Sequence, residues 1–218
     1  MTTGNPGATS VAIDPRRPAT LTRDLITVGV FTALYFVIMA VVGQLGALVP
    51  ITQVLGPLYI PILCGIPFML FVTRVTRFGL ITAMGWIIGI LYLVTGQSWV
   101  ATVLAFVLGL VADLIAKQGH YRSWPLLVVS FVVFSEMAIG MVVPLFFQRQ
   151  ATLDRIAARG HEEAWVNQIV SLTPAWMFYV MIVMIIVGAI IGAHLGRGVF
   201  RKHFAYLAPA AARDAADA

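Results

Sequence analysis

Apolar residues run along most of the chain in stretches that no charged residue interrupts. Three such stretches cover residues 25–73, 78–112 and 164–196. A membrane helix needs about 20 mostly apolar residues to cross roughly 30 Å of hydrocarbon, so each stretch is too long for a single crossing. We therefore expect each stretch to be broken by turns or folded back on itself.

Turn-forming residues divide these stretches into six predicted transmembrane helices. A break at 50–56 separates the first two helices, and a tight turn at 96–98 separates the third from the fourth. Pro174 suits the first turn of the last helix, because proline lacks the N–H that a first turn leaves unbonded. The predicted ranges are 25–43, 55–73, 78–95, 99–116, 125–147 and 174–196.

Two of the predicted segments have unusual features. The second helix contains Pro57, Pro61 and Pro67, which remove backbone donors and should bend it. Membrane helices tolerate such prolines when neighbouring groups satisfy the freed carbonyls. Between the fifth and sixth helices, residues 148–173 mix charged and apolar positions, which predicts one or two short amphipathic helices. A lid over a pocket and a simple connection both remain open for this segment.

Composition supports a membrane protein. Hydrophobic residues make up 60% of the 218 positions and charged residues only 11%, with a mean hydropathy of +0.94. Soluble proteins carry about 25% charged residues. The chain divides into a flexible N-terminal tail (1–22) without an apolar signal region, a membrane domain (23–204) and a flexible C-terminal tail (205–218). The single cysteine, Cys64, excludes an intrachain disulfide and is typical of a small core residue.

Basic residues are distributed unevenly between the two predicted sides. With the N-terminus in the cytoplasm, eleven basic residues fall inside and three outside, as the positive-inside rule requires. An even number of spans then predicts a multi-pass protein of the bacterial cell membrane with both termini cytoplasmic. This topology also explains the net charge of +5 without a nucleic-acid partner. The inside residues are Arg16, Arg17, Arg23, Arg74, Arg77, Lys117, Arg122, Arg197, Arg201, Lys202 and Arg213; the outside ones are Arg149, Arg155 and Arg159.

The sequence contains no recognisable enzyme motif. The four histidines fall in separate segments without metal-ligand spacing, and no glycine-rich phosphate-binding loop occurs. Glu162-Glu163 begins a pattern known from intramembrane prenyl-protein proteases, but Asn167 stands where that pattern needs arginine and the segment lies outside the spans. We therefore expect no catalytic residue, no metal and no cofactor held by this chain.

Glu136 is the one ionisable residue near the middle of a predicted span. A carboxylate at mid-bilayer costs at least about 2.5 kcal/mol, so such residues face a cavity or a partner and mark functional sites. We expect Glu136 to bind substrate. The alternative is a protonated glutamate hydrogen-bonded to a neighbouring helix. Asp113, four residues before Lys117 near the inner end of the fourth helix, predicts a structural ion pair.

Polar and aromatic residues gather on the predicted outer side. Small-molecule sites need apolar and aromatic walls with a few directed polar groups, and these residue types supply both. The alternative is the aromatic belt that membrane proteins form at both interfaces whatever their function. The candidate binding residues on this side are Gln97, Ser98, Trp99, Gln148, Arg149 and Trp176.

Small residues spaced by four occur on three predicted helices and allow another helix to approach closely. On the third and sixth helices, ordinary internal packing is the better explanation. Gly29 and Ala33 on the first helix are interpreted below as a partner surface. The other members are Gly85 and Gly89 on the third helix and Gly188, Gly192 and Gly196 on the sixth.

Several strings together resemble one protein family over about residues 21–204. They are RDLITVGVFTA (23–33), CGIPFML (64–70), ADLIAK (112–117), PLFF (144–147), LTPAWM (172–177) and RKHF (201–204). This combination resembles the Trep_Strep group, also called MptD-type, of substrate-binding S components of energy-coupling factor (ECF) transporters.

The resemblance implies an all-α, six-helix S component that binds a vitamin or other scarce micronutrient at its outer face. It would dock on a membrane T component with two ATPases, which hydrolyse the ATP, and topple in the membrane to release substrate. Small residues on the first helix of S components contact the T component, and Gly29 and Ala33 occupy the matching place. In S components generally, the ligand contacts come from outer loops and the outer halves of helices four to six. Substrate identity does not follow.

Two other function classes remain open. A stand-alone secondary transporter would need no ATPase, although the halves show no internal repeat and a single mid-span charge is available for ion coupling. A non-catalytic membrane scaffold would leave the outer pocket without a small molecule. Our leading hypothesis places the substrate pocket among helices four, five and six, with Glu136 paired to a polar or cationic group of the ligand.

Overall fold

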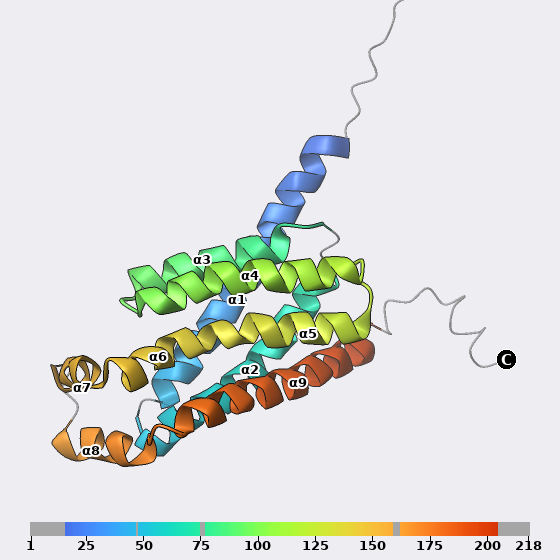
Figure 1. Cartoon of the computed structure of the whole chain (residues 1–218). Helices are drawn as coiled ribbons and strands as arrows, with labels where there is room; N and C mark the ends of the chain where they lie inside the picture. The colour runs from blue at the N-terminus through green and yellow to red at the C-terminus, as the bar shows by residue number, and fades with distance from the viewer. Residues whose placement is uncertain (1–15, 47, 75–76, 159–161, 205–218) are drawn as a thin grey trace, which may run out of the picture.

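The computed structural model describes residues 16–46, 48–74, 77–158 and 162–204, and these fold into a bundle of long helices (Figure 1). Residues 1–15 of the predicted N-terminal tail and all of 205–218 lie outside the described residues, as do Arg159 and Arg213. In chain order the elements are α1 (Arg16–Gly46), α2 (Pro50–Val72), α3 (Leu80–Val94), α4 (Trp99–Gln118), α5 (Trp124–Ser135), the 3-10 turn η1 (Glu136–Ala138), α6 (Ile139–Phe147), α7 (Arg149–Ala158), α8 (Glu163–Leu172) and α9 (Met177–Phe204).

Six of these helices form a closed ring. Each one contacts the next in the circular order α1, α2, α9, α5, α4, α3, and α3 contacts α1 again. Among the described residues, five segments are long and apolar enough to cross a membrane: Thr22–Gln44, Pro50–Val72, Trp99–Gln118, Trp124–Phe147 and Met177–Val199. With 15 residues, α3 is about 22 Å long, shorter than the hydrocarbon layer. The bundle is therefore a multi-pass helical membrane fold, and its sixth crossing stays a prediction.

Several helix boundaries differ from the predicted ones. α1 begins at Arg16, before the predicted start at residue 25. The predicted break at 50–56 is wrong, because Val49 is extended and Pro50 opens α2 as its first residue, where its missing N–H costs nothing. Pro174 lies in a turn ahead of α9, and its carbonyl oxygen accepts a hydrogen bond from the backbone N–H of Met177 (2.9 Å). The turn at 96–98 is confirmed.

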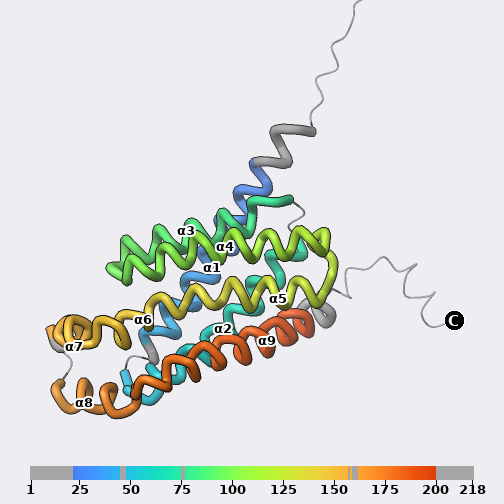
Figure 2. The backbone as a smooth tube through the Cα atoms, viewed as in Figure 1, coloured from blue at the N-terminus to red at the C-terminus, as the bar shows by residue number. Residues whose placement is uncertain are grey.

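The predicted fifth helix is divided. α5 ends at Ser135, η1 tightens the backbone for one turn, and α6 continues in nearly the same direction (Figure 2). Beyond this turn, Gly140 packs directly against the backbone of Ala101, which holds α6 against α4. Pro144 lies inside α6 and removes one more backbone donor. Glu136 therefore sits at an irregular point of the span.

Glycines also allow two further pairs of helices to approach closely. A Cβ at Gly192 on α9 would lie 2.5 Å from the carbonyl oxygen of Pro61 on α2, and one at Gly196 would lie 2.8 Å from that of Gly65. Between α3 and α4, a Cβ at Gly85 would lie 2.9 Å from Cα of Gly109. These distances confirm the internal-packing interpretation for the small residues of the third and sixth predicted helices.

Aromatic residues fill the middle of the ring. Phe68 on α2 stacks against Phe131 and Phe134 on α5, with ring centroids 4.7 and 4.9 Å apart. Tyr35 on α1 meets Phe134 edge-on at 5.7 Å, and Cys64 lies fully buried beside it. Edge-on and offset ring pairs add stability beyond the area that they bury. This aromatic core fills the bundle interior between α1, α2 and α5.

A buried carboxylate ties the start of α3 to α4. Oδ2 of Asp113 accepts hydrogen bonds from the backbone N–H groups of Gly79 (2.8 Å) and Thr82 (3.0 Å) and from the Thr82 hydroxyl (2.9 Å). Oδ1 accepts from the Tyr121 hydroxyl (2.7 Å). Burial and this contact raise the pKa of Tyr121. The predicted pair with Lys117 is not formed, since the Lys117 nitrogen lies over the Phe78 ring, 4.9 Å from its centroid.

Candidate functional site

A cavity of about 650 Å³ opens at one end of the ring, above the aromatic core. Helices α7 and α8 and the α3–α4 turn lie at this end, which we call the cavity end (Figure 1). The walls come from the last turns of α1, the first half of α2, α6 and the start of α9. Residues from α7 and α8 also line the cavity, so these two short helices form part of its cover.

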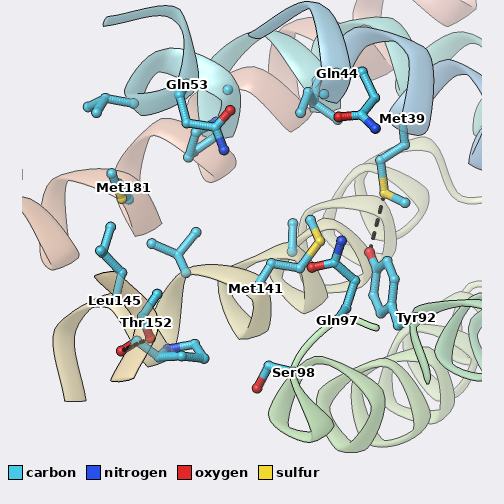
Figure 3. A pocket seen from close by; sticks show the side chains of 18 of the residues that line it. Met39, Gln44, Gln53, Tyr92, Gln97, Ser98, Met141, Leu145, Thr152 and Met181 are labelled. Carbon is cyan, nitrogen blue, oxygen red and sulfur yellow. Dashed lines mark hydrogen bonds between the residues drawn. The ribbon is translucent and has the colours of Figure 1, made fainter. Parts of the chain in front are cut away.

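Three glutamine amides surround the cavity. Gln44 ends the membrane segment of α1, Gln53 lies in the first turn of α2, and Gln97 lies in the α3–α4 turn. Their side chains point toward the same space in Figure 3, and none of the three side-chain amides makes a hydrogen bond to a residue that the structure describes. Each amide offers donors and an acceptor, so these groups are available to a polar ligand.

The remaining walls are mostly apolar and rich in sulfur. Met39, Met141 and Met181 enter from α1, α6 and α9, and Tyr92 closes the floor with its hydroxyl donated to the sulfur of Met39 (3.3 Å; Figure 3). Trp165 on α8 adds a second aromatic wall. Methionine side chains are flexible and polarizable, and they adapt to the flat faces of ring compounds. The lining thus combines adaptable apolar walls with a few directed polar groups.

One charged side chain lies among the lining residues described. Arg155, in the second half of α7, is exposed at the cavity end, and its guanidinium makes no hydrogen bond or ion pair with any described residue. The neighbouring acid, Asp154, is engaged elsewhere, since its carboxylate accepts a hydrogen bond from the Gln150 amide (3.0 Å). The cavity therefore carries a free positive charge on the α7 side.

Specific side chains hold α7 and α8 in place. The Arg149 guanidinium donates to the carbonyl oxygens of Thr173 and Val170, both at 2.9 Å, and so satisfies the C-terminal end of α8. The Thr152 hydroxyl donates to the carbonyl oxygens of Pro144 (3.0 Å) and Gln148 (2.9 Å), which joins α7 to α6. The predicted amphipathic segment is thus two helices anchored over the cavity.

The structure brings only some of the predicted binding residues to the cavity. Gln97 and Ser98 line it, and Ser98 also caps α4 by accepting from the N–H of Val100 (3.1 Å). Trp99 and Trp176 point away, with exposed fractions of 65% and 60%. Those side chains suit the membrane interface, which was the alternative explanation for them. Gln148 is exposed and Arg149 holds α8, and neither is among the lining residues.

Glu136 does not line the cavity, although Ala138 two residues later does. The side chain is half-buried, and its Oε1 atom is enclosed without a hydrogen-bond partner among the residues described. The predicted pocket among helices four, five and six also differs from the cavity observed. Helices α1 and α2 supply much of the wall, whereas α4 contributes only its capping residue Ser98, because α4 packs along α3 and α5 instead.

The sequence-based prediction missed the residues Gln44, Gln53 and Arg155. The first two are lone amides at the ends of apolar spans, a signal that was available but resembles ordinary helix punctuation. Arg155 was seen only as a charge in a connecting segment. Among the described residues, no group of three histidine, cysteine or acidic side chains lies close enough to hold a metal ion.

Comparison with known proteins gives one match. The family model of a hypothetical bacterial integral membrane protein, Trep_Strep, matches residues 22–205. No curated protein and no solved structure matches the chain. The matched region contains all the elements from the membrane segment of α1 to the end of α9, and with them the whole cavity.

Proposed function

Because the chain belongs to the Trep_Strep family of bacterial integral membrane proteins, we propose that it is the substrate-specific binding subunit (S component) of an ECF-type importer. In this role it captures a vitamin or other scarce micronutrient and delivers it through a T component driven by two ATPases. The chain itself is not an enzyme and binds no cofactor. The observation that carries the proposal is the cavity at one end of a membrane bundle.

The cavity has the properties of a small-molecule site. Its volume of about 650 Å³ falls within the roughly 300–1,000 Å³ of known ligand pockets. Methionine and aromatic side chains supply apolar surface, while Gln44, Gln53, Gln97 and Arg155 supply polar groups that no described residue engages. The aromatic core lies below it, so a molecule entering from the cavity end would be held there.

Charge supports an orientation with the cavity end outside and both termini cytoplasmic. Six basic residues with described side chains lie at the opposite end of the bundle, which we call the basic end, whereas Arg149 and Arg155 lie at the cavity end. The positive-inside rule then favours a cytoplasmic basic end. In this arrangement α3 makes the sixth crossing beside α4. The residues of the basic end are Arg23, Arg74, Arg77, Lys117, Arg122 and Arg197.

The exposed face of α1 supports a docking role for Gly29 and Ala33. No described atom lies within 4 Å of a Cβ built at Gly29, in contrast to the closely packed glycines of α9. Ala33 is exposed too, and the large side chains of Ile26 and Val30 beside it are 62% and 59% exposed. A flat apolar stripe of this kind lets a partner helix approach closely. The T component is the partner that we assign to it.

Gly29→Leu and Ala33→Leu should each reduce co-purification with a T component and its two ATPases at least tenfold. The added side chain would hold the partner helix away from α1. The measurement is a pull-down from cells that co-express the four subunits. Gly198→Leu on α9 is the matched control, because that glycine is also open to its surroundings within the described structure. Full recovery of the partners with both α1 variants would contradict this assignment.

Glu136→Gln should change small-molecule affinity less than twofold, because Glu136 is not among the lining residues. The measurement is calorimetry, which compares the affinities of purified wild type and variant for a compound found by mass spectrometry to be carried through purification. A loss of tenfold or more would restore Glu136 to the binding site and would show that η1 rearranges when the cavity is filled.

Mass spectrometry of small molecules carried through purification tests the proposed function itself. The full chain is purified in lipid nanodiscs and its bound compounds are extracted. A variant with a blocked cavity, Gly56→Trp, serves as the control, because Gly56 lines the cavity wall. A compound present with the wild type and absent with the variant is the expected result. Identical extracts from the two proteins would argue for a scaffold without a ligand.

A further inference from the structure

We propose that the cavity takes an organic acid that carries an amide, lactam or urea group at the end remote from its acidic group. This inference rests on the proposed function, because it names the chemical class of the molecule held in the same cavity. It differs from the cationic ligand that Glu136 alone would predict.

The negative charge that we assign to the ligand is inferred from Arg155. Its guanidinium is the one charged group among the described lining residues, and no acidic side chain accompanies it there. Arg149 is the other arginine of α7, and its guanidinium donates hydrogen bonds to carbonyl oxygens at the end of α8. Arg155 is therefore the cation of α7 that remains available to a ligand. A guanidinium binds carboxylate or phosphate through paired hydrogen bonds. A cationic ligand would instead meet repulsion at this position.

The amide-type group at the other end of the ligand is inferred from the glutamine side chains. In Figure 3, Gln44 and Gln97 lie on one side of the cavity, and Thr152, three residues before Arg155 on α7, lies across from Gln97. A carboxamide donates and accepts hydrogen bonds, so it is matched by a group that does both. Amides, lactams and ureas meet this requirement, whereas an ammonium only donates. Because Arg155 follows Thr152 by less than one turn of α7, we assign the acidic group and the amide-type group to opposite ends of the ligand.

The walls between the two ends favour a flat or apolar middle section. Met141 from α6 and Met181 from α9 flank the space, and Tyr92 presents an aromatic surface at the amide side (Figure 3). Sulfur and aromatic surfaces pack well against rings and alkyl chains. A small sugar, which carries hydroxyl groups on every side, would leave most of its polar groups unbonded against these walls.

A panel of paired compounds tests the inference on the full chain in nanodiscs. Biotin is paired with biotin amide, pantothenate with panthenol, and orotate with uracil, so that each acid has an uncharged partner. Nicotinate is an acid without an amide, and thiamine and choline are cations. The protein is incubated with the equimolar mixture, and retained compounds are quantified by mass spectrometry against empty nanodiscs. We expect at least one of the three amide-bearing acids to be retained at least tenfold more than its uncharged partner.

Variants assign the preference to particular side chains. Arg155→Gln should weaken retention of that acid about tenfold and Arg155→Lys less, because lysine keeps the charge. Gln97→Leu should weaken it as well. Arg122→Gln, at the basic end, should change nothing. Retention of the cations, of nicotinate or of the uncharged partners in preference to the three amide-bearing acids would overturn the inference, and so would an Arg155→Gln variant that matches wild type.

The two proposals fail in different ways. Retention of no panel compound would overturn the inference about chemical class. The carry-over experiment needs no chosen compound, so it decides separately whether the cavity holds a small molecule. A carried-over amine, for example, would leave the proposed function standing and remove the inference.

Discussion

Asp113→Ala is expected to lower the free energy of unfolding by about 3 to 5 kcal/mol. The substitution leaves four donors without their acceptor: the N–H groups of Gly79 and Thr82 and the hydroxyls of Thr82 and Tyr121. Asp113 and Thr82 are buried, so water replaces few of these bonds, and an unbonded buried donor costs about 1–3 kcal/mol. The start of α3 should detach from α4.

Thermal and SDS-induced unfolding in detergent, followed by circular dichroism, measures this loss. Tyr121→Phe removes one of the four bonds and should cost about 1 kcal/mol. Asp154→Ala is the matched control, because that exposed aspartate bonds only to Gln150 among the residues described. If Asp113→Ala and Asp154→Ala unfolded at the same SDS concentration, the Asp113 contacts would have no stabilising role.

Gly192→Leu should separate α9 from α2 and destabilise the fold by about 3 kcal/mol or more, the upper end of what overpacking costs. A Cβ at residue 192 would already lie 2.5 Å from the Pro61 carbonyl oxygen and 2.8 Å from that of Ile62, and these are backbone atoms that cannot turn aside. Leucine adds three further carbons to that contact. The expected result is loss of monodisperse protein in size-exclusion chromatography and a much lower unfolding midpoint.

Gly198→Leu provides the comparison on the same helix. No described neighbour lies within 4 Å of a Cβ at residue 198, so the same change should leave the elution profile and the unfolding midpoint as in wild type. Gly192→Ala should fall between the two variants. Equal behaviour of Gly192→Leu and Gly198→Leu would show that α2 and α9 are packed less closely than their glycines indicate.

Hydropathy predicted the helices because the bilayer demands long apolar segments, but it did not predict their ends. The start of α2 depended on Pro50, which was interpreted as a break although proline also opens helices. The division at Glu136 lies next to the contact of Gly140 with Ala101, two residues far apart in sequence. Long-range contacts of this kind are not encoded in the local pattern.

The residues of the candidate site were predicted only in part, because some of them reach the cavity through long-range contacts. Gln97 and Ser98 lie in a turn whose place follows from the two apolar runs around it, so their position at one end of the bundle was accessible. Arg155 reaches the cavity only because Arg149 and Thr152 anchor α7 and α8 over it. Glu136 was chosen for its depth alone, and depth does not fix the direction in which a side chain points.

The aromatic core below the cavity also limits how material can cross the membrane. Phe68, Phe131 and Phe134 are fully buried in the bundle interior, so among the residues that the structure describes the interior below the cavity is filled by aromatic side chains. In the proposed S-component role, passage would be stoichiometric, with one molecule carried for each reorientation of the whole subunit, and not a diffusive flux through an open pore. Its rate would saturate at the frequency of that reorientation, however much substrate is supplied.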